Sequence, residues 1–414
     1  MTNPIANAGQ FAAEADVAAM LGDERIKNAR MMVERLFVMG FGDRIPEPER
    51  PLLGAFCDEY VNNWLFKAAA SDAQHPRFVR DFMPGYSWHG HDVPAARTGG
   101  DNPDNCYRLA GIAHGTSYRI RGRILDAKPA NVSLTLTANY GTSRTVQTIE
   151  DHQLEIDGNG EFVVTIDDQP ANGRANHMTT APEVKFLFVR DSMMDWATET
   201  PLDLQIERIG AAKADPIGLD EMAARGAFRL LDDFHLYFWF QNVWSGRNWN
   251  TLQPPAQNRG TGGLVTQGLS HGTFRLGEDD VAILDYNPAG AGYVAVQLTE
   301  WLYRSLDYHE IQSSLTGTQS VVDGDGRIRL VIARRDPGVA NWLDTGGAEN
   351  VFMILRWQNI PANPLNGGLD ARLTMSTQDR LKRDLPGDTR WFDAAQRKAQ
   401  RDARFAAYAR RITE

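Results

Sequence analysis

One sequence pattern occurs twice in this chain, and it constrains the fold more than any other feature. Each copy begins with a turn sequence, Asp157-Gly158-Asn159-Gly160 or Asp323-Gly324-Asp325-Gly326, and ends in an apolar run that closes on an arginine, Arg190 or Arg356. The distance along the chain from the first Asp to the last Arg is the same in both copies. Self-similarity of this kind predicts two related β modules.

The residues around these turns favour strands over helices. Asp-Gly and Asn-Gly adopt positive φ readily, so each copy is expected to begin with a hairpin-like turn. The flanking runs are short and rich in Val, Ile, Phe and Leu, which is typical of buried strands. We therefore predict a mainly β fold with two related β-sandwich or jelly-roll modules, an N-terminal helical region and a connecting helix.

Composition excludes several classes of protein. The chain has 414 residues and a net charge of −10, which argues against sequence-independent nucleic-acid binding, because that needs a positive surface. Cys57 and Cys106 are the only cysteines, so a disulfide framework and a cysteine-based zinc site are not expected. The N-terminus has no secretory-signal pattern, and no apolar run reaches transmembrane length. We expect a cytoplasmic protein with no membrane partner.

The rest of the chain divides into helical and irregular regions. Residues 10–70 and 218–249 have apolar residues at helical spacing, whereas 78–121 is rich in Gly and Pro and is expected to be an irregular loop. Residues 389–412 are expected to form a charged helix that lies solvated on the surface. The predicted parts are 1–98 (helical region and loop), 99–215 (first module), 216–268 (helical connector), 269–360 (second module) and 361–414 (extended segment and C-terminal helix).

Several motifs resemble the DUF1214 domain family. They are Ser314–Gln319, Asp323–Gly326, Asp336–Gly347 with its Asn341-Trp342-Leu343 sequence, and Leu355–Trp357. Upstream, Gly100–Tyr107 and Tyr118–Gly122 resemble the DUF1254-like first half of longer members. The resemblance covers about residues 100–357 and implies β-sandwich or jelly-roll modules with added helices. It does not imply an activity, because the function of the family is poorly defined. The tail after Trp357 is longer than the family pattern, so its role is left open.

The first candidate site is the loop Asp101-Asn102-Pro103-Asp104-Asn105 with the adjacent Tyr107 and Arg108. Two carboxylates on one loop can act as general acid and base if they reach the transferred proton. We assign Asp101, Asp104 and Tyr107 as catalytic, and Asn102 and Arg108 as substrate-binding. The alternative is a turn cluster whose Asp and Asn side chains cap nearby backbone groups.

A second candidate lies between two strands of the second repeat. Asp336 is assigned a catalytic role, and Asn341 and Trp342 are assigned to substrate binding. The alternative, which we favour for Asn341 and Trp342, is maintenance of the fold, because both copies keep the Asn. For Arg190 and Arg356 a paired structural role, such as bonding to a loop carboxylate, is favoured over catalysis.

Aromatic residues mixed with polar ones form a third candidate, since such mixtures line clefts for sugars and rings. The alternative is an interdomain core, because large aromatic side chains dominate cores as well. The residues assigned to substrate binding from this set are His235, Trp239, Trp244, Trp249, Trp301 and Tyr303.

Other motifs carry less weight. His89 and His91 could supply two metal ligands, with a third from His271, His235 or Asp285, but we predict no bound metal. Gly268-Leu269-Ser270-His271-Gly272 matches a nucleophile elbow, but no helix is expected after the Ser, so we interpret it as a chance loop. There is no P-loop or Rossmann fingerprint, so no cofactor is expected.

These observations predict an enzyme that acts on a small oxygenated or sugar-like substrate in a cleft between the modules. The chemistry would be acid–base, as in a lyase or hydrolase, and it would need no nucleotide. The alternative is a non-catalytic protein that binds a small molecule or takes part in an assembly. A metal-dependent enzyme that uses His89 and His91 is the third hypothesis. A small-molecule substrate is the expected partner, and homo-oligomerisation is left open.

Overall fold

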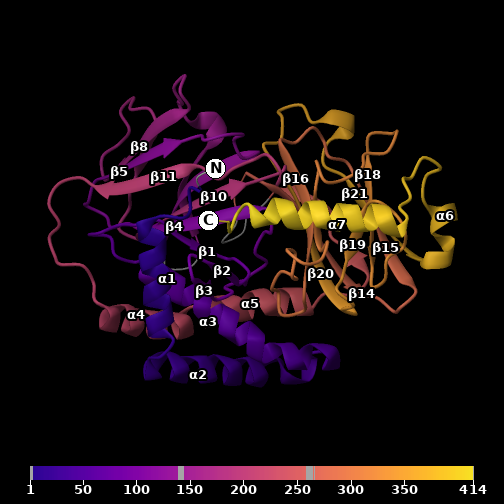
Figure 1. Ribbon diagram of the computed structural model, residues 1–414, viewed down its shortest axis with the longest axis horizontal. Coiled ribbons are helices and arrows are strands. Elements are labelled where there is room, and N and C mark those ends of the chain that lie inside the picture. Colours follow the sequence, from indigo (N-terminus) through magenta and orange to yellow (C-terminus); the bar gives the residue numbers. More distant parts are fainter. Residues whose placement is uncertain (1–2, 139–143, 258–263, 265, 414) are drawn as a thin grey trace.

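A computed structural model describes residues 3–138, 144–257, 264 and 266–413, without the side chains of Leu236, Trp244 and Ser245. It is mainly β, as predicted, with two β modules, an N-terminal helical region and helices between the modules (Figure 1). Four hydrophobic clusters are formed by the described residues. One lies inside each module, and a third lies where the helices pack against both modules. The fourth covers the other face of the smaller sheet of the second module, where Leu381 and Leu385 pack.

Side-chain caps fix the start of the first two helices. Asn7 accepts a hydrogen bond from the backbone N–H of Gln10, and Asp23 accepts one from Arg25. The N-terminal helices are α1 (Ala8–Met20), α2 (Glu24–Phe41) and α3 (Leu53–Ala69), with the 3₁₀ turns η1 (Gly42–Arg44) and η2 (Glu47–Leu52) between α2 and α3. In the described part of the chain, no helix has the length and apolar character needed to cross a bilayer.

The first module is a sandwich of two sheets. Its larger sheet has the order β1 (Val79–Asp81), β4 (Asn105–Gly111), β10 (Val184–Ser192), β6 (Asn131–Ala138) and β7 (Arg144–Glu150). Its smaller sheet has the order β11 (Asp203–Arg208), β5 (Tyr118–Arg123), β8 (Glu161–Asp167) and β9 (His177–Thr179). The hairpin of β2 (Tyr86–Trp88) and β3 (His91–Val93) and the 3₁₀ turn η3 (Asp151–Gln153) lie outside these sheets.

The second module has the same two-sheet arrangement. Its larger sheet has the order β12 (Thr251–Leu252), β14 (Gly268–Arg275), β20 (Asn350–Gln358), β16 (Tyr293–Thr299) and β17 (Ser314–Thr316), and β13 (Ala256–Gln257) also pairs with β14. Its smaller sheet has the order β19 (Trp342–Asp344), β18 (Ile328–Ala333), β15 (Asp280–Tyr286) and β21 (Ala371–Thr377).

The two modules share one strand order, which confirms the repeat. In each smaller sheet one pair is parallel, β8 with β9 and β18 with β19. The repeated Asn makes equivalent hydrogen bonds: Asn176 binds both backbone groups of Glu155, and Asn341 binds both of Val321. Arg190 and Arg356 occupy the same position in the nine-residue strands β10 and β20.

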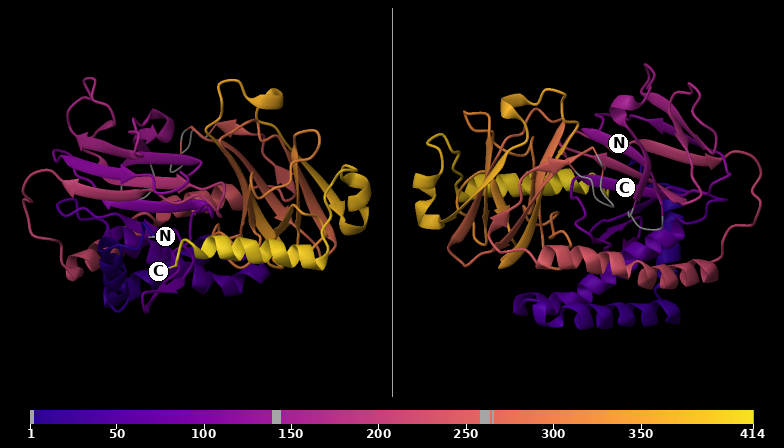
Figure 2. Two further views of the ribbon diagram at one scale, coloured as in Figure 1. Left: turned by 45° about the horizontal axis from the view of Figure 1, so that its top comes forward. Right: turned by 180° about the vertical axis from the view of Figure 1, so that it is seen from behind.

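Helices join and cover the modules. In sequence, α4 (Leu219–Asp232) and α5 (Phe234–Ser245) connect the two modules. In space, helices α2–α5 run along one side of both modules (Figure 1). After β20 come η4 (Leu365–Gly367), η5 (Gln378–Arg380), α6 (Leu381–Asp384) and α7 (Ala394–Ala409). Helix α7 lies along the second module and its C-terminal end reaches the first (Figure 2).

The predicted C-terminal helix is present as α7, but one of its faces is buried and not solvated. Arg397, Arg404 and Arg411 are buried. Arg397 pairs with Asp336, Arg404 donates to the backbone oxygen of Tyr308 at 3.0 Å, and Arg411 donates to the backbone oxygen of Pro103 at 2.6 Å. The helix therefore ties the two modules together.

Three other segment predictions were wrong. Residues 78–121 contain strands β1–β4 rather than one irregular loop, and β1 precedes the predicted start of the first module. Residues 361–388 contain β21, which pairs with β15 beyond the predicted end of the second module. Gly268–Gly272 is part of strand β14 and not a loop, so Ser270 is not on a nucleophile elbow.

Candidate functional site

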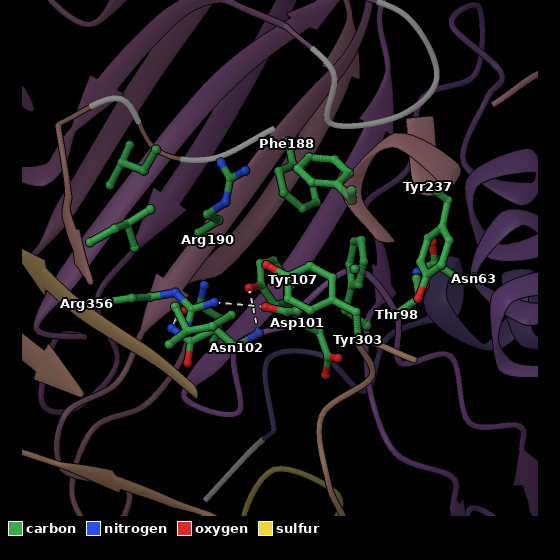
Figure 3. Close-up of a pocket in the computed structure, with 18 of the residues that line it drawn as sticks. Asn63, Thr98, Asp101, Asn102, Tyr107, Phe188, Arg190, Tyr237, Tyr303 and Arg356 are labelled. Carbon is green, nitrogen blue, oxygen red and sulfur yellow. Dashed lines mark hydrogen bonds between the residues drawn. The ribbon is translucent and has the colours of Figure 1, made fainter. Parts of the chain in front are cut away.

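A cavity of about 300 Å³ lies between the two modules (Figure 3). Its walls come from the larger sheet of each module, from helices α3 and α5, and from the loop that precedes β4. Side chains alternate across a strand. Leu187 and Met353 therefore face the module cores, whereas Phe188 and Ile354 face the cavity. The outer faces of the two repeats thus meet at one site.

The two repeat-equivalent arginines both line this cavity. Arg190 and Arg356 approach it from neighbouring positions (Figure 3). Both are buried. The guanidinium of Arg356 is fixed by Gln297 and donates to the backbone oxygen of Gly100 at 2.8 Å. The guanidinium of Arg190 lies 4.3 Å from the ring centroid of Phe188.

The electrostatic surroundings of Arg190 are unusual for an arginine. The pKa of Arg190 is lowered to about 10, chiefly by burial and in part by the nearby Arg356, while Tyr107 and Asp81 act in the opposite direction. Arg190 therefore stays protonated at neutral pH, but its charge is costly in this enclosed position. The sequence interpretation of a paired structural role missed the cavity that both arginines line.

Part of the predicted Asp101–Tyr107 cluster lies in the cavity wall. Asp101 is buried, and its carboxylate accepts hydrogen bonds from the backbone N–H of Ser305 at 3.1 Å and from its hydroxyl at 2.7 Å. Burial raises the pKa of Asp101 to about 6. Tyr107 and Asn102 also line the cavity, and the Tyr107 hydroxyl accepts a hydrogen bond from the backbone N–H of Asn102 at 3.0 Å.

Asp104 and Arg108 do not line the cavity. Asp104 is fully buried, and its carboxylate accepts hydrogen bonds from Trp196 Nε1 at 2.9 Å and from the Tyr293 hydroxyl at 2.6 Å. Arg108 points to the other side of its strand, where it forms an ion pair with Asp191 at 2.5 Å. Neither side chain lines the cavity, so both have structural roles.

The second predicted cluster lies in the smaller sheet of the second module, away from the cavity. Asp336 pairs with Arg397 of α7. Asn341 holds the backbone at Val321, and Trp342 is buried and donates from Nε1 to the backbone oxygen of Ala333 at 3.0 Å. None of these three side chains lines the cavity, and their contacts agree with the fold-maintenance role favoured for Asn341 and Trp342. The catalytic role of Asp336 stays a prediction.

The predicted aromatic set is divided between cavity and core. Trp239 and Tyr303 line the cavity. Trp301 is buried in the helical core, the ring of Trp249 stacks on that of Phe352 with centroids 6.1 Å apart, and His235 is exposed. None of these three lines the cavity. The side chain of Trp244 lies outside the described residues.

Sequence reasoning missed a lysine on α3. Lys67 is 6% exposed, lines the cavity, and donates from Nζ to Oδ1 of Asn63 one helical turn earlier. Strand β1 places the fully buried Asp81 nearby, and burial raises the pKa of Asp81 to about 7. No periodic signal marks Lys67, because lysines in helices are usually exposed.

His271 was another missed residue, since its motif was interpreted as a chance loop. It lines the cavity from β14, and burial lowers its pKa to about 3, with Arg247 and Arg356 adding to the shift. Its imidazole is therefore neutral at physiological pH. A neutral imidazole can accept or donate a hydrogen bond without adding charge.

The histidine pair is engaged near the N-terminus rather than at the cavity. His91 Nε2 lies 2.6 Å from Oε2 of the buried Glu14, and His89 packs against Phe11. Across the described ranges, no three His, Cys, Asp or Glu side chains group as metal ligands.

Comparison with known proteins supports the fold alone. No protein-family model matches the sequence, and no curated protein does either. The crystal structure of an uncharacterised protein from Burkholderia cenocepacia is similar, with a TM-score of 0.70 and 24% identity over 91% of this chain and 100% of that chain. A protein from Vibrio parahaemolyticus matches with a TM-score of 0.40 and 10% identity, over 66% of this chain and 90% of that chain. The first likeness shows a shared fold, and neither name assigns an activity.

Proposed function

We propose that the protein binds a small organic anion in the cavity between the modules. The observation that carries this proposal is that the repeat-equivalent Arg190 and Arg356 both line it. Arg247 adds a further cationic side chain to the lining. Like charges in an enclosed space repel one another, and a bound anion offsets that repulsion.

The acidic residues of the lining offset only part of this charge. The carboxylate side chains in the lining are those of Asp101 and Asp233. Burial raises the pKa of each, which disfavours its charged form. Asp101 is also bound to Ser305. The cavity is therefore better suited to an organic acid than to a neutral sugar.

The shape and lining of the cavity favour a carboxylate with a flat or apolar body. A guanidinium presents a planar fork of donors that matches a carboxylate. The apolar lining includes Phe82, Phe188, Phe240 and Ile354. A cavity of about 300 Å³ fits a small molecule.

Acid–base catalysis on such a substrate is the second candidate. It is favoured by Asp101, which lies in the cavity wall with its pKa raised to about 6, close to the range of a general acid or base. Membership of the DUF1214 family, a cytoplasmic location and homo-oligomerisation stay predictions from the sequence.

The test compares matched anions and neutral molecules. We expect 4-(hydroxymethyl)benzoate and a panel of small aryl and alkyl carboxylates to raise the melting temperature, whereas the uncharged 1,4-benzenedimethanol has little effect. Arg190→Gln and Arg356→Gln should each weaken carboxylate binding about 10-fold or more in calorimetric titration, since a charged hydrogen bond is worth about 1.5–3 kcal/mol.

The matched control is Arg119→Gln, because Arg119 is partly exposed on the smaller sheet of the first module. This variant should bind the carboxylates normally. The proposal fails if no carboxylate in the panel stabilises the protein more than its neutral counterpart. It also fails if both cavity variants melt cooperatively and bind as the wild type does.

A further inference from the structure

The cavity also contains a buried amine, and we infer that Lys67 forms an imine with a carbonyl compound that carries the bound anionic group. This inference rests on the proposed function and names the substrate class. The substrate would be an oxo acid with a flat or apolar body between its carbonyl and its carboxylate.

Lys67 is positioned as a reacting group and not as a surface charge. Among the lysines, all of which the structure describes, it alone is buried; Lys128 and Lys185, for comparison, are partly exposed. Its Nζ donates to Asn63 and lies 4.7 Å from the ring centroids of both Trp64 and Phe82. The amine is therefore held at one place in the cavity wall.

A continuous aromatic surface connects this amine to the proposed anion site. The ring centroids of Phe82 and Tyr107 are 5.0 Å apart, and Tyr107 stacks on Phe188 at 5.5 Å. Arg190 lies over the far end of this surface, 4.3 Å from the Phe188 centroid (Figure 3). A flat molecule on this surface, with its carboxylate at the arginines, directs its other end toward Lys67.

Charge near Lys67 supports a neutral amine. Burial lowers the pKa of Lys67, against the attraction of Asp81 and Asp233. Burial also raises the pKa of both acids, so their protonated forms are favoured as well. Arg190, on β10 and separated from β1 by β4, interacts electrostatically with Asp81. Only an unprotonated amine attacks a carbonyl carbon.

The reaction balances with the groups present. The lone pair of Lys67 Nζ attacks the carbonyl carbon, the C=O electron pair moves to oxygen, and one Nζ proton transfers to that oxygen. Asp233, which lines the cavity, then donates a proton to the hydroxyl group, which leaves as water, and accepts the remaining Nζ proton. The products are a C=N bond and one water, and no oxidant or reductant is consumed.

The alternative role for Lys67 is that of a counter-ion for the buried Asp81. The two roles differ in reactivity. A lysine that only neutralises Asp81 stays protonated and does not form imines, whereas a neutral lysine in the cavity reacts faster than the exposed lysines.

The experiment uses the full-length protein with 4-formylbenzoate, which has both a carbonyl and a carboxylate, and with cyanoborohydride to reduce any imine. Peptide mass mapping then reports the labelling rate at every lysine. We expect Lys67 to be labelled several-fold faster than Lys128, which is partly exposed and paired with Asp151, because burial lowers the pKa of Lys67 and so raises its neutral fraction. Arg190→Gln and Arg356→Gln should slow this labelling, but not labelling by benzaldehyde, which lacks the carboxylate.

The outcomes separate the two proposals. If wild-type Lys67 is labelled no faster than Lys128 while 4-(hydroxymethyl)benzoate still binds in an arginine-dependent way, the imine inference is overturned and the anion site stands. If labelling of Lys67 is fast but the same for both aldehydes and for both arginine variants, the anion site is overturned. The first question is decided by labelling rates in the wild-type protein, so it needs no substitution at Lys67.

Discussion

Tyr293 of the second module donates a hydrogen bond of 2.6 Å to Oδ2 of Asp104 in the first module. Trp196 Nε1 binds the other carboxylate oxygen at 2.9 Å. Burial raises the pKa of Asp104, and these two donors act in the opposite direction. The pair is therefore a buried polar link between the modules, outside the cavity.

Removing the hydroxyl of Tyr293 should destabilise the protein, because this hydroxyl binds Asp104 and also accepts a hydrogen bond from Asn102 Nδ2 at 2.8 Å. Tyr293→Phe leaves a buried carboxylate oxygen short of a donor, so we expect the free energy of unfolding to fall by about 1–3 kcal/mol. Chemical denaturation measures this change. Normal stability together with lost carboxylate binding would contradict the structural role and would indicate that Asp104 belongs to the binding site.

His271 should make the protein less stable in acid. Its pKa is lowered to about 3 in the folded state, whereas an unfolded histidine titrates near 6.5. Below pH 6.5 the unfolded state therefore takes up a proton that the folded state does not. The stability contribution is complete above pH 6.5 and is lost progressively toward pH 3, by about 2 kcal/mol between pH 6.5 and 5. His271→Gln should flatten this part of the profile, and an unchanged slope in the variant would refute the assignment.

Asp101 should contribute a pH dependence of the opposite sign. Its folded pKa is about 6 and the unfolded value is about 3.9, so the folded state holds a proton more tightly. Stability therefore falls as pH rises from about 4 to about 6. Asp101→Asn should remove this decrease, and denaturation at pH 4.5 and 7 measures it. If the wild type and the variant have parallel profiles, the carboxylate does not titrate in this range.

The repeated asparagine allows the two modules to be compared directly. Asn341 is buried and binds both backbone groups of Val321 and the backbone oxygen of Arg329. Asn176 makes the matching pair of bonds to Glu155 in a more exposed setting. Asn341→Ala should therefore cost more stability than Asn176→Ala, by about 1–2 kcal/mol, because orphaned buried groups are expensive. Equal losses in thermal or chemical denaturation would show that burial does not distinguish the two sites.

The attachment of α7 can be tested at Arg404. Its guanidinium is buried, donates to Ser314 Oγ at 2.6 Å and lies 4.1 Å from the ring centroid of Trp196. Arg404→Ala should lower the free energy of unfolding by about 2 kcal/mol or more, as expected for the loss of a buried network. Lys398→Ala, which removes only a surface pair with Asp402, is the control and should change it by less than about 0.5 kcal/mol. Similar melting of both variants would mean that α7 does not tie the modules.

Local patterns account for the part of the fold that was predicted. Turn sequences such as Asp157-Gly158, alternating apolar residues and the repeated Asn are short-range signals, and each predicted an element that the structure contains. Strand β21 was missed because it gains its role only by pairing with β15, a contact that nothing near Ala371–Thr377 encodes. The arginines of α7 looked like a solvated face for the same reason.

The cavity was harder to predict than the fold. The Asp101–Tyr107 loop and Trp239 were found by composition, yet Asp101 and Asp104 have different environments although only two residues separate them. No sequence pattern around Lys67 distinguishes it from an exposed helical lysine. Arg190 and Arg356 could have been recognised, because both repeats place an arginine at the same position of an apolar strand. Burying such a charge is costly unless it has a function.

The walls of the cavity come from parts of the chain that are distant in sequence, from Tyr60 on α3 to Gln358 on β20. Contacts of such high sequence separation are expected to form late in folding. A ligand at this site therefore binds only the fully assembled chain and stabilises it by mass action. Cellular ligand concentration would then set the lifetime of the whole protein as well as the occupancy of one site.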